Sequence, residues 1–328
     1  MTLGLLSQTA LADESDRSVP FYLEAESGGA DIDVASTSVH PYDGRTPEVN
    51  MQYSLDGVKW YTIISYGHTV YGGKSIHLNA GQRIYFRAAD EIIRLAHTAY
   101  RKDAAWHFIS EDPIRTGGNI LSLLYHDFSD KTTFPDKSDA NFAGLFLNCK
   151  GLTDASALLL PTETAPYCYE SLFEGCTSLV NPPELPATHM EYLCYGSMFE
   201  GCTALETAPE LPNINLDDQY CSEMFRDCTS LNTIRVAFTS WGSHKFYGTR
   251  IWTRNVAPTG TFYCPEKLSA RYDESHIPTG WTVVRTTGSS TLGGSTLSGG
   301  NVWIMVAAAV AVGVVAVIIK KKKKSDKN

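Results

Sequence analysis

The stretch Cys194–Leu205, which reads CYGSMFEGCTAL, decides the fold because its pattern returns at a regular interval. The pattern Phe-x-x-Cys-x-x-Leu occurs in four successive units, whose cysteines are separated by 27, 26 and 26 residues. A repeat of this length is typical of proteins in which similar units stack and shield each other's apolar side. We therefore expect one buried ladder of side chains. Its members are Phe146, Cys149, Leu152, Phe173, Cys176, Leu179, Phe199, Cys202, Leu205, Phe225, Cys228 and Leu231.

The spacing inside each unit predicts a short helical turn. Cys168, Leu172 and Cys176 are four residues apart, and the next unit has the same spacing. Residues four apart share one face of a helix, so this face is expected to be buried between units. The Pro-Glu-Leu-Pro segments at 183–186 and 209–212 would then end each helical turn.

The repeated motif CYxxMFxGCTSL followed by PELP resembles the BspA-like leucine-rich repeats of bacterial surface proteins. The segment Gly260–Val284 similarly looks like the C-terminal cap of such arrays. The resemblance covers residues 117–285. It implies an extracellular, anchored protein that adheres to host proteins or other cells and carries no catalytic residues. Since this array has only about four units, its binding surface is expected to be small.

The N-terminal region predicts an antiparallel β-sandwich. From Val19 to Glu91, short runs of β-branched and aromatic residues alternate with turn residues. Asp56-Gly57 lies between two such runs and predicts a hairpin. Four aromatic residues could stack on a sugar ring, although ordinary core and cross-strand pairs are the favoured interpretation. These residues are Trp60, Tyr61, Tyr66 and Tyr71.

The C-terminal region predicts a membrane anchor. Val302–Ile319 is uncharged over 18 residues and is followed by five lysines. Such a segment is expected to span a bilayer as a helix, with the lysines in the cytoplasm and the head outside the cell. Ala10-Leu-Ala12 resembles a signal-peptide cleavage site. The alternative is a tail-anchored protein whose head stays in the cytoplasm.

The predicted fold class is therefore α+β, with an N-terminal antiparallel β-sandwich, a short leucine-rich-repeat solenoid and one C-terminal transmembrane helix. The expected segments are 1–17 (remnant of a signal peptide), 18–112 (β-sandwich), 113–256 (solenoid with its N-terminal cap), 257–285 (C-terminal cap), 286–300 (Gly/Ser/Thr linker), 301–319 (transmembrane helix) and 320–328 (basic cytoplasmic tail).

Charge and motifs exclude several functions. Residues 1–319 carry 21 basic and 35 acidic side chains, a net charge of −14 that disfavours nucleic acid as a partner. The sequence contains no Cys-x-x-Cys, His-Glu-x-x-His or Gly-x-Ser-x-Gly motif, so no metal, cofactor or catalytic residue is expected.

The eight cysteines are expected to be buried thiols, with disulfides between units as the alternative. Carboxylates on the repeats are expected to be solvated rather than a glycosidase pair. These are Asp154, Glu163, Glu170, Glu174 and Glu184.

The sequence thus predicts a membrane-anchored adhesion or recognition protein, not an enzyme. Its expected partner is a protein or glycan on a host or neighbouring cell. The alternatives are a surface carbohydrate-active enzyme or its glycan-binding accessory protein, and a phage-derived binding protein. The identity of the ligand and the oligomeric state stay open.

Overall fold

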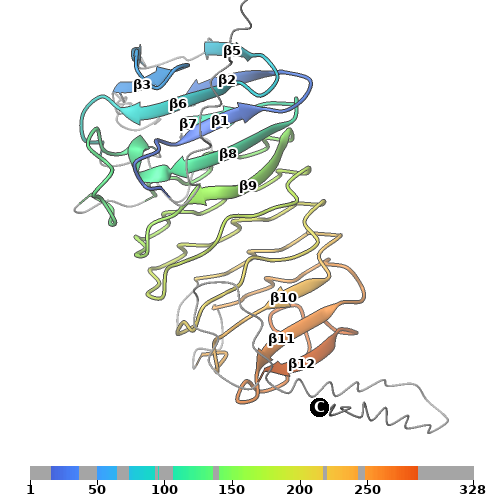
Figure 1. The fold of residues 1–328 in the computed structure, drawn as a ribbon. Helices are drawn as coiled ribbons and strands as arrows, with labels where there is room; N and C mark the ends of the chain where they lie inside the picture. The colour runs from blue at the N-terminus through green and yellow to red at the C-terminus, as the bar shows by residue number, and fades with distance from the viewer. Residues whose placement is uncertain are drawn as a thin grey trace, which may run out of the picture.

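The computed structural model describes residues 16–36, 50–64, 74–92, 95, 106–135, 140–216, 220–242 and 248–286. These residues form twelve β-strands and one short 3-10 helix, and contain no α-helix. Figure 1 shows two parts: a β-sandwich at the N-terminal end, and below it a stack of chain circuits that extends to the last described strand. We call residues 140–286 the coil stack and each circuit a coil.

The sandwich consists of two sheets that pack face to face. The larger sheet has the strand order β4-β3-β6-β1-β8-β9, and the smaller has the order β5-β2-β7. The strands of the larger sheet are β1 (Tyr22–Ala25), β3 (Asn50–Ser54), β4 (Tyr61–Ile64), β6 (Arg83–Ala88), β8 (Ile114–Asn119) and β9 (Leu152–Leu159). Those of the smaller are β2 (Ala30–Ser36), β5 (Lys74–Leu78) and β7 (Trp106–Ile109).

A cluster of phenylalanines joins the two sheets. Phe86 of the larger sheet lies with its ring centroid 4.8 Å from that of Phe108 in the smaller sheet, and Phe21 lies 5.2 Å from Phe108. All three side chains are fully buried. Burial of aromatic surface of this kind supplies much of the stability of a small sandwich.

The larger sheet runs directly into the coil stack. All pairs in this sheet are antiparallel except the last, in which β9 pairs parallel with β8. The 3-10 helix η1 (Ile120–Leu123) follows β8, and the Asn119 side chain caps it by accepting a hydrogen bond from the Leu121 N–H. One hydrophobic core therefore extends without a break from the sandwich into the stack.

The coils are built from successive non-helical turns. Along residues 167–176, alternate backbone N–H groups donate to the next coil, as in Phe173 N to Met198 O at 2.9 Å. The intervening N–H groups close local turns, as in Leu172 N to Tyr169 O at 3.2 Å. Every fourth residue adopts a left-handed backbone conformation, with φ of 58° at Tyr167, 56° at Ser171 and 75° at Gly175.

This geometry overturns the predicted α+β class and its leucine-rich-repeat solenoid with helical turns. The described residues are mostly β and form three sheets. Cys168, Leu172 and Cys176 do face the core together, and each is fully buried. In a chain of four-residue turns, as in an α-helix, every fourth side chain faces the same side. The four-residue spacing of these residues therefore fits both structures and could not distinguish them.

The predicted transmembrane helix at residues 301–319 lies outside the described residues, as do the proposed signal-peptide remnant up to residue 15, the linker from residue 287 and the basic tail. Among the residues that the structure describes, no helix has the length and apolar character needed to cross a bilayer. The predicted cell-membrane localisation depended on such a helix and has no support in the residues that the structure describes.

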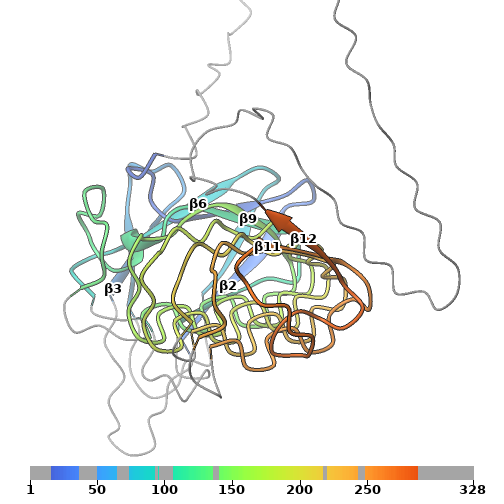
Figure 2. The same cartoon turned by 90° about the horizontal axis from the view of Figure 1, so that it is seen from below.

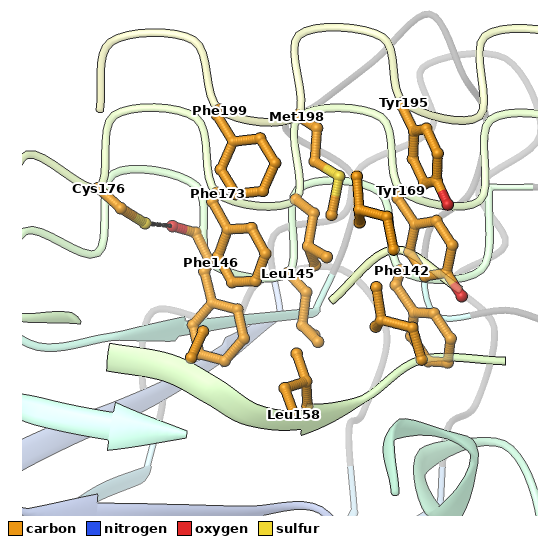
Figure 3. Close-up of a cluster of buried hydrophobic side chains, with 14 of the residues drawn as sticks. Phe142, Leu145, Phe146, Leu158, Tyr169, Phe173, Cys176, Tyr195, Met198 and Phe199 are labelled. Atoms are coloured by element: carbon orange, nitrogen blue, oxygen red, sulfur yellow. Dashed lines mark hydrogen bonds between the residues drawn. The ribbon is translucent and has the colours of Figure 1, made fainter. Parts of the chain in front are cut away.

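Columns of stacked side chains fill the coil stack (Figure 3). Phe146, Phe173, Phe199 and Phe225 follow one another with centroids 5.6, 5.4 and 5.7 Å apart and ring planes within 15°. A parallel column contains Phe142, Tyr169 and Tyr195. Viewed along the stack, the coils overlay as loops around this core (Figure 2).

The last coils of the stack pair through a parallel sheet of β10 (Thr233–Arg235), β11 (Thr261–Pro265) and β12 (Thr282–Thr286). Phe262 of β11 and Trp252 are both fully buried with their ring centroids 6.4 Å apart, and the Trp281 indole N–H donates to the Ala257 carbonyl at 2.8 Å. Large aromatic side chains therefore fill the core of the last coils.

Candidate functional site

The β3–β4 hairpin concentrates exposed apolar side chains. Within the described residues six large hydrophobic side chains are exposed, and three of them lie between residues 55 and 61. Leu55 is 44% exposed, Val58 83% and Tyr61 42%. Isolated exposed apolar residues are common on protein surfaces, whereas a local group of them is typical of a contact site. We call residues 55–61 the hairpin tip.

The hairpin tip is held in one conformation by Asp56. One carboxylate oxygen of Asp56 accepts hydrogen bonds from the N–H groups of Val58 and Lys59, both at 2.8 Å. The buried Ser54 hydroxyl donates to the same oxygen at 2.9 Å and accepts from the Gly57 N–H at 2.9 Å. The bonds from Lys59, Val58 and Ser54 favour the carboxylate form and so lower the pKa of Asp56.

The hairpin predicted from Asp56-Gly57 is therefore present, with a longer connection than a two-residue turn. Tyr53 pairs with Tyr61, and residues 55–60 connect the two strands. Gly57 has φ of 72°, a conformation that glycine adopts without steric cost. The longer loop is what exposes Leu55 and Val58.

One side of the tip rests on an aromatic pair. The Tyr61 ring stacks on Tyr53 at 5.4 Å with 26° between the planes, and the Lys59 ammonium lies 5.1 Å from the Tyr61 centroid. Interaction with Tyr61 raises the pKa of Lys59. Tyr53 itself packs against the sandwich core. Tyr61 is thus anchored on one side while part of its ring faces solvent.

Tyr61 pairs with Tyr53, whereas Trp60 contacts Arg87, whose strand partner is Gln52; since Gln52 and Tyr53 are consecutive in β3, the two rings lie on opposite faces of the sheet. The Arg87 guanidinium carbon lies 4.0 Å from the Trp60 centroid, and its Nε donates to the Gln52 amide oxygen at 2.9 Å. Trp60 and Tyr61 therefore do not form one flat glycan platform. Tyr66 and Tyr71, the other two residues of that hypothesis, lie outside the described residues.

The outer face of the larger sheet is internally paired. Arg83 forms an ion pair with Glu24 and lies 4.1 Å above the Tyr22 ring, while Arg115 lies 3.8 Å from Glu24. The Tyr22 ring occupies the space above Gly117, where an added Cβ would come within 2.4 Å of the Tyr22 hydroxyl. This face is polar and satisfied, so it offers a weaker contact site than the hairpin tip.

Some carboxylates of the coils form structural contacts, and others face the solvent. Asp154 accepts hydrogen bonds from Ser156 and Asn181, which lower its pKa against the opposing effect of burial. Glu163 and Glu184 are solvent-exposed. Glu200, which the sequence reasoning did not select, is the most buried carboxylate of the coils. Burial raises its pKa although it forms an ion pair with Arg226.

The eight cysteines are all free and buried, as expected for packed thiols. The thiols of Cys176, Cys202 and Cys228 each donate to the phenylalanine carbonyl of the preceding coil, at 3.1, 3.1 and 2.9 Å. Burial raises the pKa of Cys149 and of Cys194 to about 12. A thiol in this state is a poor nucleophile and a poor metal ligand. Among the described residues, no group of three or more metal-ligating side chains is assembled.

The ladder residues selected from the sequence are brought together, and all twelve side chains are fully buried. They hold the coils together and are inaccessible to a partner. Sequence reasoning missed Leu55 and Val58; their only signal was the presence of apolar residues on both sides of an Asp-Gly turn. Comparison of the chain with protein-family models, curated protein sequences and solved structures gives no match.

Proposed function

We propose that this chain is a recognition protein that binds a partner protein through the hairpin tip. The observation that carries the proposal is the exposure of Val58 and Leu55 on a loop whose conformation Asp56 fixes. Fully burying an exposed aliphatic side chain in a partner's pocket is worth about 1.5–3 kcal/mol, and Leu55, which is 44% exposed, gains only part of this. Because the loop is already ordered, little conformational entropy is lost on binding.

The chemistry of the tip favours a protein over a glycan. Leu55 and Val58 are aliphatic, and an aliphatic knob suits an apolar protein pocket. A sugar ring is better matched by a flat aromatic surface, and Trp60 and Tyr61 point to opposite faces of the sheet. Lys59, which belongs to the tip, adds a preference for a pocket with a carboxylate at its rim.

The resemblance of the repeat motif to BspA-like proteins supports the same proposal, because that family adheres to other proteins and cells. In this proposal the coil stack is a rigid support that carries the sandwich. Its columns of buried side chains are well suited to that role, since a close-packed core has low compressibility.

An array experiment tests the proposal. The full chain is applied to an array of extracellular host proteins and to a glycan array, alongside Val58→Asp and the matched control Val180→Asp. Val180 is an exposed valine in the coil stack, 51% accessible. We expect at least one protein to be captured by the parent and the control and lost with Val58→Asp. Capture only by glycans, or equal capture by all three chains, would contradict the proposal.

A further inference from the structure

One arginine on the outer face of the larger sheet has no carboxylate partner. Glu24 forms ion pairs with both Arg83 and Arg115, and Glu26 lies 3.9 Å from Arg115. Arg87 follows Arg83 by four residues in β6, so both side chains point to the same side of the sheet. Within the residues that the structure describes, no carboxylate lies within ion-pair distance of Arg87. Its positive charge is therefore available to a ligand.

Two neighbours hold Arg87 in a fixed orientation. Its guanidinium carbon lies 4.0 Å from the centroid of the Trp60 ring, and its Nε donates to the Gln52 amide oxygen at 2.9 Å. Gln52 is also the strand partner of Arg87, so the register of β3 and β6 already places the two side chains next to each other. A guanidinium that is oriented before binding loses less conformational entropy when it pairs with a ligand.

The two Nη groups are the part of the Arg87 guanidinium that remains open. The side chain is half-buried, and in the described part of the chain its only hydrogen bond is the one from Nε. Burial lowers the pKa of Arg87, and the charge of Asp127 opposes this effect without forming an ion pair. Two parallel N–H groups at the end of a guanidinium match the two oxygens of one carboxylate.

The charge around Arg87 favours a carboxylate over a phosphate or a sulfated glycan. Residues 1–319 carry a net charge of −14, from 21 basic and 35 acidic side chains, which repels anions with several negative charges. Arg87 supplies a single positive charge at this position. One guanidinium can pair with a monovalent carboxylate without help from other cations.

We propose that Arg87 binds an Asp or Glu side chain of the partner protein that the hairpin tip recognises, with Trp60 and Gln52 as positioning residues. This inference rests on the proposed function, because Trp60 belongs to the hairpin tip and lies two residues from Val58. The partner surface therefore combines an apolar pocket for the tip with an acidic side chain beside that pocket.

Nuclear magnetic resonance tests the carboxylate site without the partner. The full chain, isotope-labelled at its arginines, is titrated with N-acetylglutamate α-methylamide, which carries one side-chain carboxylate, and with the neutral glutamine analogue. We expect a saturable shift of the Arg87 Nε–Hε signal with the glutamate derivative only, and none at Arg254, whose Nε already lies 3.5 Å from Glu274. No shift at Arg87, or a larger shift with inorganic phosphate at the same concentration, would overturn the assignment.

Capture on the protein array tests the link to the partner. Arg87→Gln is expected to weaken capture about tenfold, and Arg87→Lys should weaken it as well, because lysine keeps the charge but loses the planar pair of donors. The matched control Arg254→Gln should bind like the parent.

The two proposals fail in different ways. Equal capture by the parent and both Arg87 variants, while Val58→Asp abolishes capture, would refute the carboxylate contact and leave the hairpin tip as the binding site. A glutamate-dependent shift at Arg87, with capture that Val58→Asp does not change, would support the carboxylate site and refute the proposed function.

Discussion

Phe199 lies at the centre of the phenylalanine column, and its truncation measures how much the column contributes to stability. The side chain is fully buried and stacks on Phe173 at 5.4 Å and on Phe225 at 5.7 Å. Replacing a buried phenylalanine by alanine costs about 3–5 kcal/mol. Two stacking contacts of about 0.5–1.5 kcal/mol each are lost with it, which places Phe199→Ala near the upper end of that range.

The assay is urea and thermal unfolding followed by circular dichroism, with Val180→Ala as an exposed control. A loss of about 4–5 kcal/mol corresponds to a fall in Tm of roughly 8–20 °C for a domain of this size. The control should unfold within about 0.5 kcal/mol of the parent. If Phe199→Ala loses less than about 1 kcal/mol, the column does not stabilise the fold as described.

Three further predictions concern the turns, the thiols and the hairpin tip. Gly151→Ala should destabilise the chain far more than Gly201→Ala, because a Cβ on Gly151 would lie 2.0 Å from a backbone oxygen of Asp112. A Cβ on Gly201 would meet only ordinary van der Waals contacts with Gly175 at 3.8 Å, so only the φ of 72° opposes that change, at a cost of about 1 kcal/mol. Equal losses in a denaturation series would contradict the geometry. The cysteines should resist alkylation at pH 8 in the native protein and should all react in urea. The reason is that burial raises the pKa of Cys149 and Cys194 to about 12, so almost no reactive thiolate is present. A cysteine that is labelled rapidly in the native protein would show that a coil opens. The lowered pKa of Asp56 means that its hydrogen bonds stabilise the tip at pH values above the ordinary value of 3.8 and are lost as the pH falls through the lowered pKa. The protection factor for amide exchange at Val58, which is the intrinsic rate divided by the measured rate, should therefore fall only in that acidic range. In Asp56→Ala the protection factor should already be low at neutral pH.

The sandwich could be predicted because its sequence carries local signals for strands. Apolar alternation in β6 matches its burial, with every second residue of Arg83–Ala88 buried. The Asp56-Gly57 turn correctly placed a hairpin, although the bonds that lengthen the loop arise from the Ser54 hydroxyl and could not be inferred from spacing. The exposure of Val58 follows from that longer loop.

The coils could not be predicted in detail because their turns carry little sequence signature. A left-handed residue usually calls for glycine, yet Tyr167, Ser171, Leu193 and Ser197 adopt this conformation. The hydrogen bonds between coils compensate for the strain of these residues, and they depend on neighbours about 26 residues away. The period was visible in the sequence, whereas the turn type that produces it was not.

Photo-crosslinking from the hairpin tip tests the central functional claim most directly. A benzophenone side chain is placed at position 58 or, as the control, at position 180, and each full chain is irradiated with the protein captured on the array. The account predicts a covalent adduct from position 58 and none from position 180. An adduct from position 180 alone, or none from position 58 while binding persists, would show that the partner is recognised elsewhere.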